Sequence, residues 1–292
     1  MSKPITVEDF SLVSRGPSSV EGALIQRASY SGQSIEQKTL RQCRLENLAF
    51  KSAELSDCAF THSRFTDCYF KDASITRVRF IDCYFDHCDF DGATFSNCTF
   101  EYSEFRDCRI EYDQIQSCLP NNWQNVLVRL ARSLRVNAHS MGDHEQYRRF
   151  LSLELMASET HFKYVFTRFD GYYQKYGVVD RFRAFRKWAS MVLDRVLWGH
   201  GERWTRVLLI AAAVVPAFAF VFQHIAPVTN MPPGATFWNF LAFSACNFLT
   251  LTYGTAEPGS GVARALQISE AALGLLLFGL LITSLYVRIS KR

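Results

Sequence analysis

The sequence lacks the residue pairings through which cysteine-containing proteins usually bind metals. Its nine cysteines form no Cys-x-x-Cys pair and join no histidine in a ligand set, so no metal site is predicted. The chain also lacks a nucleophile beside a base, an acid–base pair and a glycine-rich phosphate loop, and its seven histidines are scattered. These absences predict a protein that is not an enzyme and that holds no cofactor.

The N-terminal part also lacks the 3.6-residue period of an amphipathic helix and the two-residue period of a single strand. Across residues 20–115 nearly every fifth residue is apolar instead, and a small or medium residue stands two positions before it. Eight of the nine cysteines occupy this small position. A fixed short period is typical of a stacked solenoid.

This pattern resembles the pentapeptide-repeat family over about one hundred residues. After an N-terminal segment, residues 1–19, the resemblance implies a right-handed quadrilateral β-helix over residues 20–118. With four repeats per coil it has about five coils and is about 24 Å tall. Residues twenty apart would stack, which places Cys68, Cys88 and Cys108 in one column. Their spacing would permit disulfides, but a cytosolic compartment favours small buried thiols.

Charge divides along the chain. Residues 20–118 carry sixteen acidic and eleven basic side chains, and residues 119–206 carry eight acidic and fifteen basic ones. Residues 119–202 therefore form a basic linker, with helices predicted at 123–136, 143–166 and 179–197. The third helix is amphipathic, with aromatic and basic residues, and is predicted to lie on the inner leaflet of a membrane. The alternative is a helix packed on the repeat domain. Beside a membrane, anionic lipid is the nearer anion, so no nucleic-acid partner is predicted.

Two long apolar runs follow, at residues 207–225 and 268–287. Each is long enough to cross the ~30 Å hydrocarbon layer as a helix, and neither lies where a signal peptide would. Basic residues precede the first run and follow the second, whereas the segment between them has a single basic residue. The positive-inside rule then predicts a multi-pass protein of the cell (inner) membrane with both termini in the cytoplasm. Residues 203–292 form this membrane domain.

The connecting segment is too apolar for an ordinary exposed loop. Residues 236–249 predict one short helix, about half the length of a span, with Thr236 as a candidate N-cap. Short apolar segments of this kind are often re-entrant. The five residues that follow have backbone carbonyls that could replace the hydration shell of a cation: Thr250, Leu251, Thr252, Tyr253 and Gly254. The alternative is two anchor helices joined by an amphipathic extracellular hairpin.

Residues 250–258 resemble the filter of two-transmembrane potassium channels, and the resemblance extends over about residues 203–292. Thr250, Tyr253, Gly254 and Pro258 match that family's filter string. Thr252 stands where the family has glycine, and Thr255 where it usually has Asp. These departures leave open whether the pore is selective for potassium or passes cations without strong preference.

The resemblance also implies roles for the second membrane helix. Gly274 and Gly279 match hinge positions of the family's inner helix, although close helix packing would use the same residues. The face that carries Gly274 would line the cavity, with Phe278, Ile282 and Tyr286 along it and Tyr286 at the constriction.

Two carboxylates have candidate roles near the pore. Glu257 could form a ring at the outer mouth of a tetramer, or could be a solvated loop residue. A carboxylate at the depth of Glu270 is costly unless it is paired or faces water, so Glu270 is a candidate contact to the filter scaffold.

The sequence thus predicts a mixed fold: a β-helix, a helical linker, and a two-transmembrane-helix pore domain with a re-entrant pore helix. The predicted function is a homotetrameric, potassium-conducting cation channel in the lipid bilayer. Its repeat domain would serve for sensing or assembly, through a cytoplasmic protein or a ligand. The alternative is a non-conducting membrane-anchored scaffold. A gyrase-binding DNA mimic fits poorly, because the chain has a membrane anchor.

Overall fold

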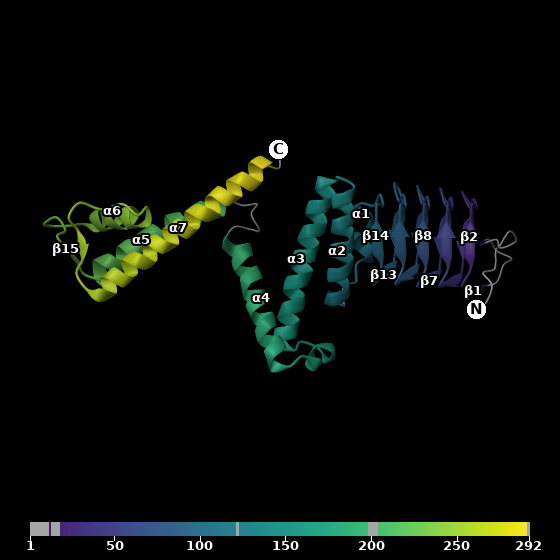
Figure 1. Cartoon of the computed structure of the whole chain (residues 1–292), viewed down its shortest axis with the longest axis horizontal. Coiled ribbons are helices and arrows are strands. Elements are labelled where there is room, and N and C mark those ends of the chain that lie inside the picture. Colours follow the sequence, from purple (N-terminus) through teal and green to yellow (C-terminus); the bar gives the residue numbers. More distant parts are fainter. Residues whose placement is uncertain (1–11, 13–17, 121–122, 198–203, 291–292) are drawn as a thin grey trace. The chain divides into compact units, whose positions relative to one another are not determined.

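The computed structural model describes residues 12, 18–120, 123–197 and 204–290, which form two compact units, residues 1–185 and 186–292. The first unit begins with a four-sided solenoid of three-residue strands, stacked as parallel sheets (Figure 1). The strands are β1 (Ser19–Glu21), β2 (Leu24–Gln26), β3 (Ser34–Glu36), β4 (Thr39–Arg41), β5 (Arg44–Glu46), β6 (Glu54–Ser56), β7 (Ala59–Thr61), β8 (Arg64–Thr66), β9 (Ser74–Thr76), β10 (Arg79–Ile81), β11 (Tyr84–Asp86), β12 (Thr94–Ser96), β13 (Thr99–Glu101) and β14 (Glu104–Arg106).

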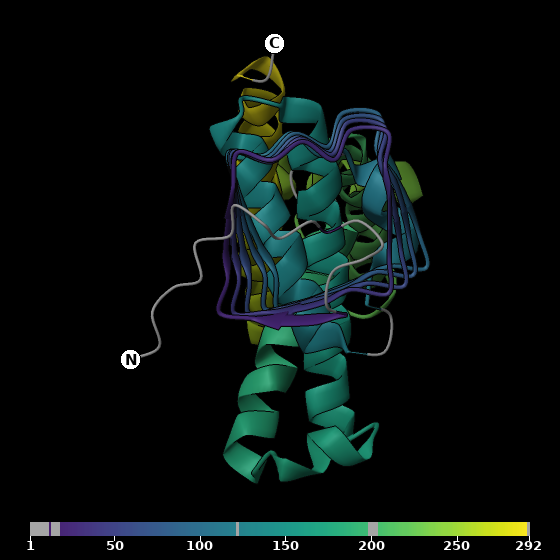
Figure 2. The ribbon, with the colours of Figure 1, turned by 90° about the vertical axis from the view of Figure 1, so that its right-hand side faces the viewer.

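Every strand pairs with the strand twenty residues away. The three sheets have the orders β1-β4-β7-β10-β13, β2-β5-β8-β11-β14 and β3-β6-β9-β12. The fourth side is a column of single bridges through Ser29, Ala49, Tyr69, Asp89 and Arg109. The view along the stack shows these four sides (Figure 2). The predicted quadrilateral β-helix is therefore confirmed.

Stacked aromatic rings fill the solenoid. The ring centroids of Phe65 and Phe85 are 4.8 Å apart, and those of Phe85 and Phe105 are 4.9 Å apart, with nearly parallel planes. Phe85 is fully buried, and the eight cysteines of this unit are buried free thiols. The twenty-residue stacking of Cys68, Cys88 and Cys108 is present, because the amide of Cys88 lies 3.4 Å from Cys108 Sγ.

The corners of the solenoid need left-handed backbone. The residue two positions after most inward apolar residues has a positive φ, as at Asn47 (φ 53°) and Asp57 (φ 53°). Asn, Asp, His and Gly tolerate this region best, and they occupy many of these corners. At Gly92 (φ 69°) a Cβ would also collide with the Asp72 side chain.

The regular stack ends one repeat earlier than the predicted boundary at residue 118. Residues that would form a further strand of the β12 sheet are instead helical, in α1 (Tyr112–Ile115) and the 3₁₀ turn η1 (Gln116–Cys118). Ile115 and Cys118 remain buried, so the side chains at the repeat positions still point inward where the backbone is no longer a strand. The capping box of α1, between Glu111 and Gln114, favours helix at this point.

Helix α2 (Gln124–Ser140) covers the open end of the solenoid. The side-chain amide of Asn137 accepts a hydrogen bond from the Cys108 amide and donates one to the Cys108 carbonyl, at 2.7 Å each. These bonds satisfy the backbone of Cys108 at the end of the stack. Helix α3 (His144–Thr167) packs on α2, where the Glu154 carboxylate pairs with Arg132 and Arg135. The two guanidinium groups hold the pKa of Glu154 below its usual value, although burial opposes this.

The linker ends in the 3₁₀ turn η2 (Gly171–Lys175) and helix α4 (Val178–Leu197). Ala184 of α4 is buried with Val165 and Tyr173, so the first half of α4 packs on the end of α3. The remaining apolar side chains of α4 include Phe182 and Leu193, which are exposed. The division between the two units falls within α4, after Phe185.

The second unit has two helices that are long and apolar enough to span a membrane, α5 (Trp204–His224) and α7 (Gly261–Ser290). Between them lie β15 (Val228–Thr229), the short helix α6 (Phe237–Phe248) and β16 (Glu257–Pro258). Figure 1 shows α6 alongside α5 and α7. Helix α7 begins seven residues before the predicted start at 268, because the helix continues through Arg264 and Gln267, which interrupt its apolar sequence.

Candidate functional site

The short helix α6 is well defined at its first residue. Thr236 and Asn239 form a capping box, in which the Thr236 amide donates to Asn239 Oδ1 at 2.9 Å. Twelve helical residues extend about 18 Å, roughly half of what is needed to cross a bilayer. The side chain of Phe243 anchors α6 in a cluster with Phe222, Ala226 and Ala263. Helix α6 is therefore a half-length helix held between two membrane-length ones.

A tight turn ends α6 and begins the candidate filter. The amide of Leu251 donates to the Cys246 carbonyl at 2.7 Å, and the amide of Thr250 donates to the Asn247 carbonyl at 2.9 Å. These two bonds define a Schellman motif, which requires left-handed backbone at the residue usually occupied by glycine. That residue is Thr250, with φ 58°. A β-branched residue is unfavourable there, so the turn stores strain at the first predicted filter residue.

The other filter residues adopt a different backbone. Gly254 is left-handed (φ 55°), whereas Thr252 lies outside the left-handed region that disfavours a β-branched residue. The side chains of Leu251 and Thr252 are exposed. Tyr253 is half-buried: its ring meets Phe243 edge-on at 6.4 Å, and its hydroxyl accepts from Asn239 Nδ2 at 3.5 Å. Tyr253 thus fastens the loop to α6.

A small antiparallel ribbon joins the two ends of the segment between α5 and α7. Strands β15 and β16 pair Thr229 with Glu257, and Thr229 Oγ1 donates to the Glu257 carbonyl at 3.0 Å. The Glu257 side chain is exposed at the end of this ribbon.

Helix α7 presents the predicted hinge and cavity residues on one continuous helix. Gly274 lies against α6, and a Cβ at this position would overlap the Phe248 carbonyl oxygen, whereas Gly279 has open space around it. Close packing therefore explains Gly274, and hinging at either glycine stays a prediction. Phe278, Ile282 and Tyr286 are all exposed in the single chain, and their role in lining a pore stays a prediction.

Polar side chains join α6 and α7 behind the filter. Ser244 Oγ bonds to the Glu270 carboxyl, and Gln267 Nε2 donates to Asn247 Oδ1 at 3.0 Å. The predicted contact between Glu270 and the filter scaffold is therefore present. The sequence analysis missed Ser244, Asn247 and Gln267. Their spacing was a usable signal, because Ser244 and Asn247 in α6, like Gln267 and Glu270 in α7, are polar residues three positions apart on one helix face.

An apolar cavity of about 370 Å³ lies below the turn at Thr250, between α5, the end of α6 and α7. Its lining includes Leu208, Phe248, Gly274 and Phe278. The predicted cavity-facing residue Phe278 and the predicted hinge residue Gly274 thus border the same space.

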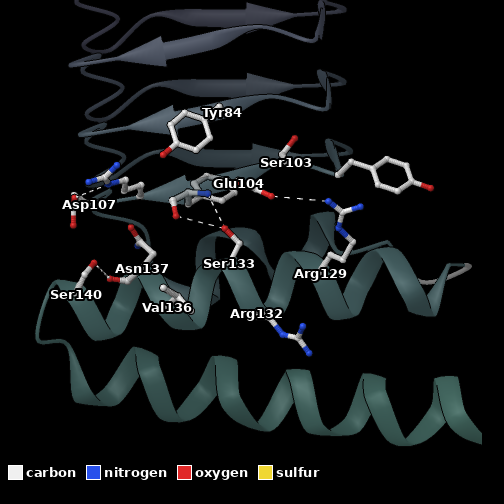
Figure 3. A pocket seen from close by; sticks show the side chains of 13 residues that line it. Tyr84, Ser103, Glu104, Asp107, Arg129, Arg132, Ser133, Val136, Asn137 and Ser140 are labelled. Atoms are coloured by element: carbon white, nitrogen blue, oxygen red, sulfur yellow. Dashed lines mark hydrogen bonds and ion pairs between the residues drawn. The ribbon is translucent and has the colours of Figure 1, made fainter. Parts of the chain in front are cut away.

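A second, polar cleft of about 620 Å³ lies in the first unit, where α2 meets the last coils of the solenoid (Figure 3). Arg129 points toward Glu104 across the cleft (4.0 Å), and Arg106 lies 3.5 Å from Asp107. The hydroxyl of Ser133 is engaged by the backbone of Phe105. Four of the charges that line the cleft are thus paired within it, and the fifth, Arg132, pairs with Glu154 of α3.

One group of side chains has metal-ligand geometry. Asp86, His87 and Asp107 have ligand atoms within 4.8 Å of one another on the solenoid surface. The ring of His87 already contacts Asp86 at 3.1 Å and Asp107 at 3.9 Å, and the His87 side chain is exposed. Contacts between exposed side chains account for this arrangement, and no metal is assigned to it.

Known family models match part of each unit. Residues 206–291 match the family described as ion channel, and residues 53–90 and 75–112 match families described as pentapeptide repeats. The chain therefore combines a pentapeptide-repeat domain with an ion-channel domain, and it is a membrane protein.

Solved structures resemble the repeat domain. A pentapeptide repeat protein (Rfr23) from the cyanobacterium Cyanothece 51142 is 9% identical, with 31% of this chain and 76% of that chain covered and a TM-score of 0.30. The plasmid-mediated fluoroquinolone resistance protein QnrB1 is 20% identical (TM-score 0.26), with 31% of this chain and 51% of that one covered. A thylakoid-lumen pentapeptide repeat protein from Arabidopsis thaliana is 18% identical (TM-score 0.22), covering 35% of this chain and 72% of its own. No curated protein matched the chain.

Proposed function

We propose that this chain is one subunit of a homotetrameric channel that conducts potassium. The observation that carries the proposal is the capped half-length helix α6, which ends between two membrane-length helices in a turn that leads into residues 250–254. A helix that ends at mid-membrane directs its negative C-terminal dipole there, which favours a cation. Backbone outside a helix is tolerated at that depth only where it is buried in protein or lines a wet cavity.

Four copies are needed because one chain supplies a single loop. A filter replaces the hydration shell of an ion from all sides, which requires loops arranged around an axis. In this assembly the carbonyls of residues 250–253 and the Thr250 hydroxyl coordinate the ion, Glu257 rings the outer mouth, and Tyr286 narrows the inner one. The hydroxyl of Thr250 donates to the Leu249 carbonyl at 2.6 Å, so its oxygen keeps lone pairs for an ion.

The proposed orientation follows the distribution of basic residues. The protein lies in the inner membrane of the cell. Both termini and the repeat domain are in the cytoplasm. The exposed apolar residues of α4, such as Phe182 and Leu193, rest on anionic lipid together with neighbouring arginines. The repeat domain then serves as a platform for sensing or assembly.

Reversal potentials under bi-ionic potassium and sodium conditions test the proposal. The wild-type protein in planar bilayers should prefer potassium, because Thr252 can hold its peptide without a left-handed φ. Thr252→Gly matches the resembled filter, so it should sharpen the preference without abolishing current.

The competing function is a non-conducting, membrane-anchored scaffold, favoured by the threonine at position 252. Absence of cation current from a verified tetramer, in both wild type and Thr252→Gly, would reject the channel and leave the scaffold.

A further inference from the structure

Three helices of the pore unit meet at one buried hydroxyl. Ser244 of α6 is fully buried, and its Oγ lies 2.8 Å from the carbonyl oxygen of Val215 in α5. The same Oγ also forms a hydrogen bond with Oε1 of Glu270 in α7, whose side chain is fully buried as well. Two oxygen atoms thus share a hydroxyl that carries one hydrogen.

The number of hydrogens fixes the direction of both bonds. A carbonyl oxygen can only accept, so the Ser244 hydroxyl must donate to Val215. The contact between Ser244 and Glu270 then has a hydrogen only if the carboxyl group supplies it. With an ionised carboxylate, one of the two close oxygen–oxygen contacts would contain no hydrogen and would be repulsive. Only the neutral carboxylic acid satisfies both contacts.

The surroundings also favour the neutral acid. Burial is the largest influence on the Glu270 carboxyl and disfavours its charged form. The neighbouring Ser244 and Asn247 are uncharged dipoles whose opposing effect is smaller, and Oε2 of Glu270 has no hydrogen-bond partner. Helices α5, α6 and α7 carry these titratable side chains within their described portions: Arg206, His224, Cys246, Arg264 and Tyr286. In the described part of the chain, none of them forms an ion pair or hydrogen bond with Glu270. A buried carboxylate without a cation is strongly disfavoured.

We propose that Glu270 is a proton-carrying positioning residue of the pore. As a neutral acid it donates to Ser244, Ser244 donates to Val215, and these two bonds hold α6 between α5 and α7. When the carboxyl proton leaves to water, the bond to Ser244 is lost, and a carboxylate faces the Ser244 oxygen instead. Helix α6 is then held less tightly against α7, and so is the loop at residues 250–254, which begins two residues after α6 ends.

A second hydrogen bond joins α6 and α7 beside the bond between Ser244 and Glu270. Asn247 and Gln267 lie three residues from Ser244 and Glu270, respectively, and bond to each other at 3.0 Å. This second contact is uncharged and does not titrate. The proton on Glu270 therefore changes one bond between α6 and α7, while the bond between Asn247 and Gln267 keeps the two helices aligned.

Infrared spectroscopy tests the protonation state without reference to conduction. The purified full chain in lipid should show the carbonyl stretch of a protonated carboxylic acid near neutral pH, and that band should be missing in Glu270→Gln. Its absence from the wild type would overturn the proposal.

Hydrogen exchange tests the positioning role. In the wild type, the α6 amides should exchange faster relative to the intrinsic rate as pH rises over roughly pH 5 to pH 9. Glu270→Gln has a permanent N–H donor to Ser244, so its α6 exchange should not change in this way. Ser244→Ala should exchange fast at all pH values. Ser269→Ala is the control, because its hydroxyl bonds only to the Ala265 carbonyl of its own helix, and it should behave like wild type. Equal pH profiles in wild type and Glu270→Gln would overturn the role.

A third test measures current, and it rests on the proposed channel function. Wild-type current should decline as pH rises, and Glu270→Gln should keep its current over the same range. A pH-dependent current in Glu270→Gln that matches wild type would remove Glu270 from control of the filter. If no form conducts, the channel proposal fails, while the infrared and exchange results still decide whether Glu270 carries the proton and positions α6.

Discussion

The repeat domain and the pore domain use similar apolar side chains but place them differently. In the solenoid the large residues point inward, and Phe65, Phe70 and Phe85 have no exposed surface. In the pore domain Leu209, Ile268 and Leu275 each expose more than 60% of their surface. In water the hydrophobic effect favours burial of apolar side chains, whereas at a surface that faces lipid it provides no such driving force. The solenoid thus builds its core from one chain, while the surface of the pore domain needs lipid to cover it.

The two regions also satisfy polar groups differently. In the solenoid, backbone bonds repeat at twenty-residue intervals, so the loss of one side chain leaves this ladder intact. In the pore domain a few buried polar side chains, including Ser244, Asn247 and Glu270, hold the helices together. We therefore expect packing to decide stability in the solenoid, and single contacts to decide geometry in the pore domain.

The largest contrast should appear in thiol labelling. Cys68, Cys88 and Cys108 are buried, so in the folded protein they should react only through unfolding, which is suppressed by orders of magnitude. Tyr69→Cys is the control, because Tyr69 is 56% exposed on the same solenoid and should label at once. Fast labelling of the three native thiols before denaturant is added would disprove the buried core.

Another buried thiol of the solenoid, Cys83, gives a dependence on pH. Burial raises the pKa of Cys83 to about 12. Because the folded pKa lies above the ordinary value, this thiol favours the folded state below that ordinary value. The contribution is lost as pH rises toward about 12.

Phe85→Ala should destabilise the solenoid by about 3–5 kcal/mol, because it removes a ring stacked on both sides. Tyr69→Ala, at an exposed position, should change the free energy of unfolding by no more than about 0.5 kcal/mol. Denaturant unfolding of both variants measures the difference. Similar losses would mean that the ring column is not the core.

Two glycines of α7 compare a closely packed position with an open one within the pore domain. Gly274→Ala should destabilise it by about 1–3 kcal/mol, because the new Cβ would overlap the Phe248 carbonyl oxygen. Gly279→Ala has open space and should be neutral or stabilise by up to about 1 kcal/mol. Thermal unfolding in detergent compares them. A stabilising Gly274→Ala would contradict the close packing of α6 on α7.

The smallest effect should come from the filter turn. Thr250→Gly removes left-handed strain at φ 58° and should stabilise the pore domain by about 1 kcal/mol. If the hydroxyl coordinates the ion, the same change should weaken potassium binding. Thr252→Gly, at a residue outside the left-handed region, should give no such stabilisation. Isothermal titration with potassium and thermal unfolding separate these effects, and equal stabilisation by both substitutions would refute the strained turn at Thr250.

Periodicity and hydropathy were sufficient to predict the elements. A five-residue period fixes which side chains point inward, and the apolar lengths of α5 and α7 give two spans, because both follow from local sequence. The end of the solenoid was less predictable. Ile115 continues the period although its backbone is helical, since the pattern reports burial rather than backbone conformation.

The sequence by itself determined the inward register of the solenoid, the two membrane-length helices and the short helix before residues 250–254. Only the tertiary structure decided which filter residue is strained, since φ at Thr250 is set by how α6 ends and not by residue type. It also decided that Gly274 serves close packing and that Ser244 bridges Val215 and Glu270. These contacts join residues 26 to 29 positions apart, which no local pattern specifies, because they depend on how three helices approach one another.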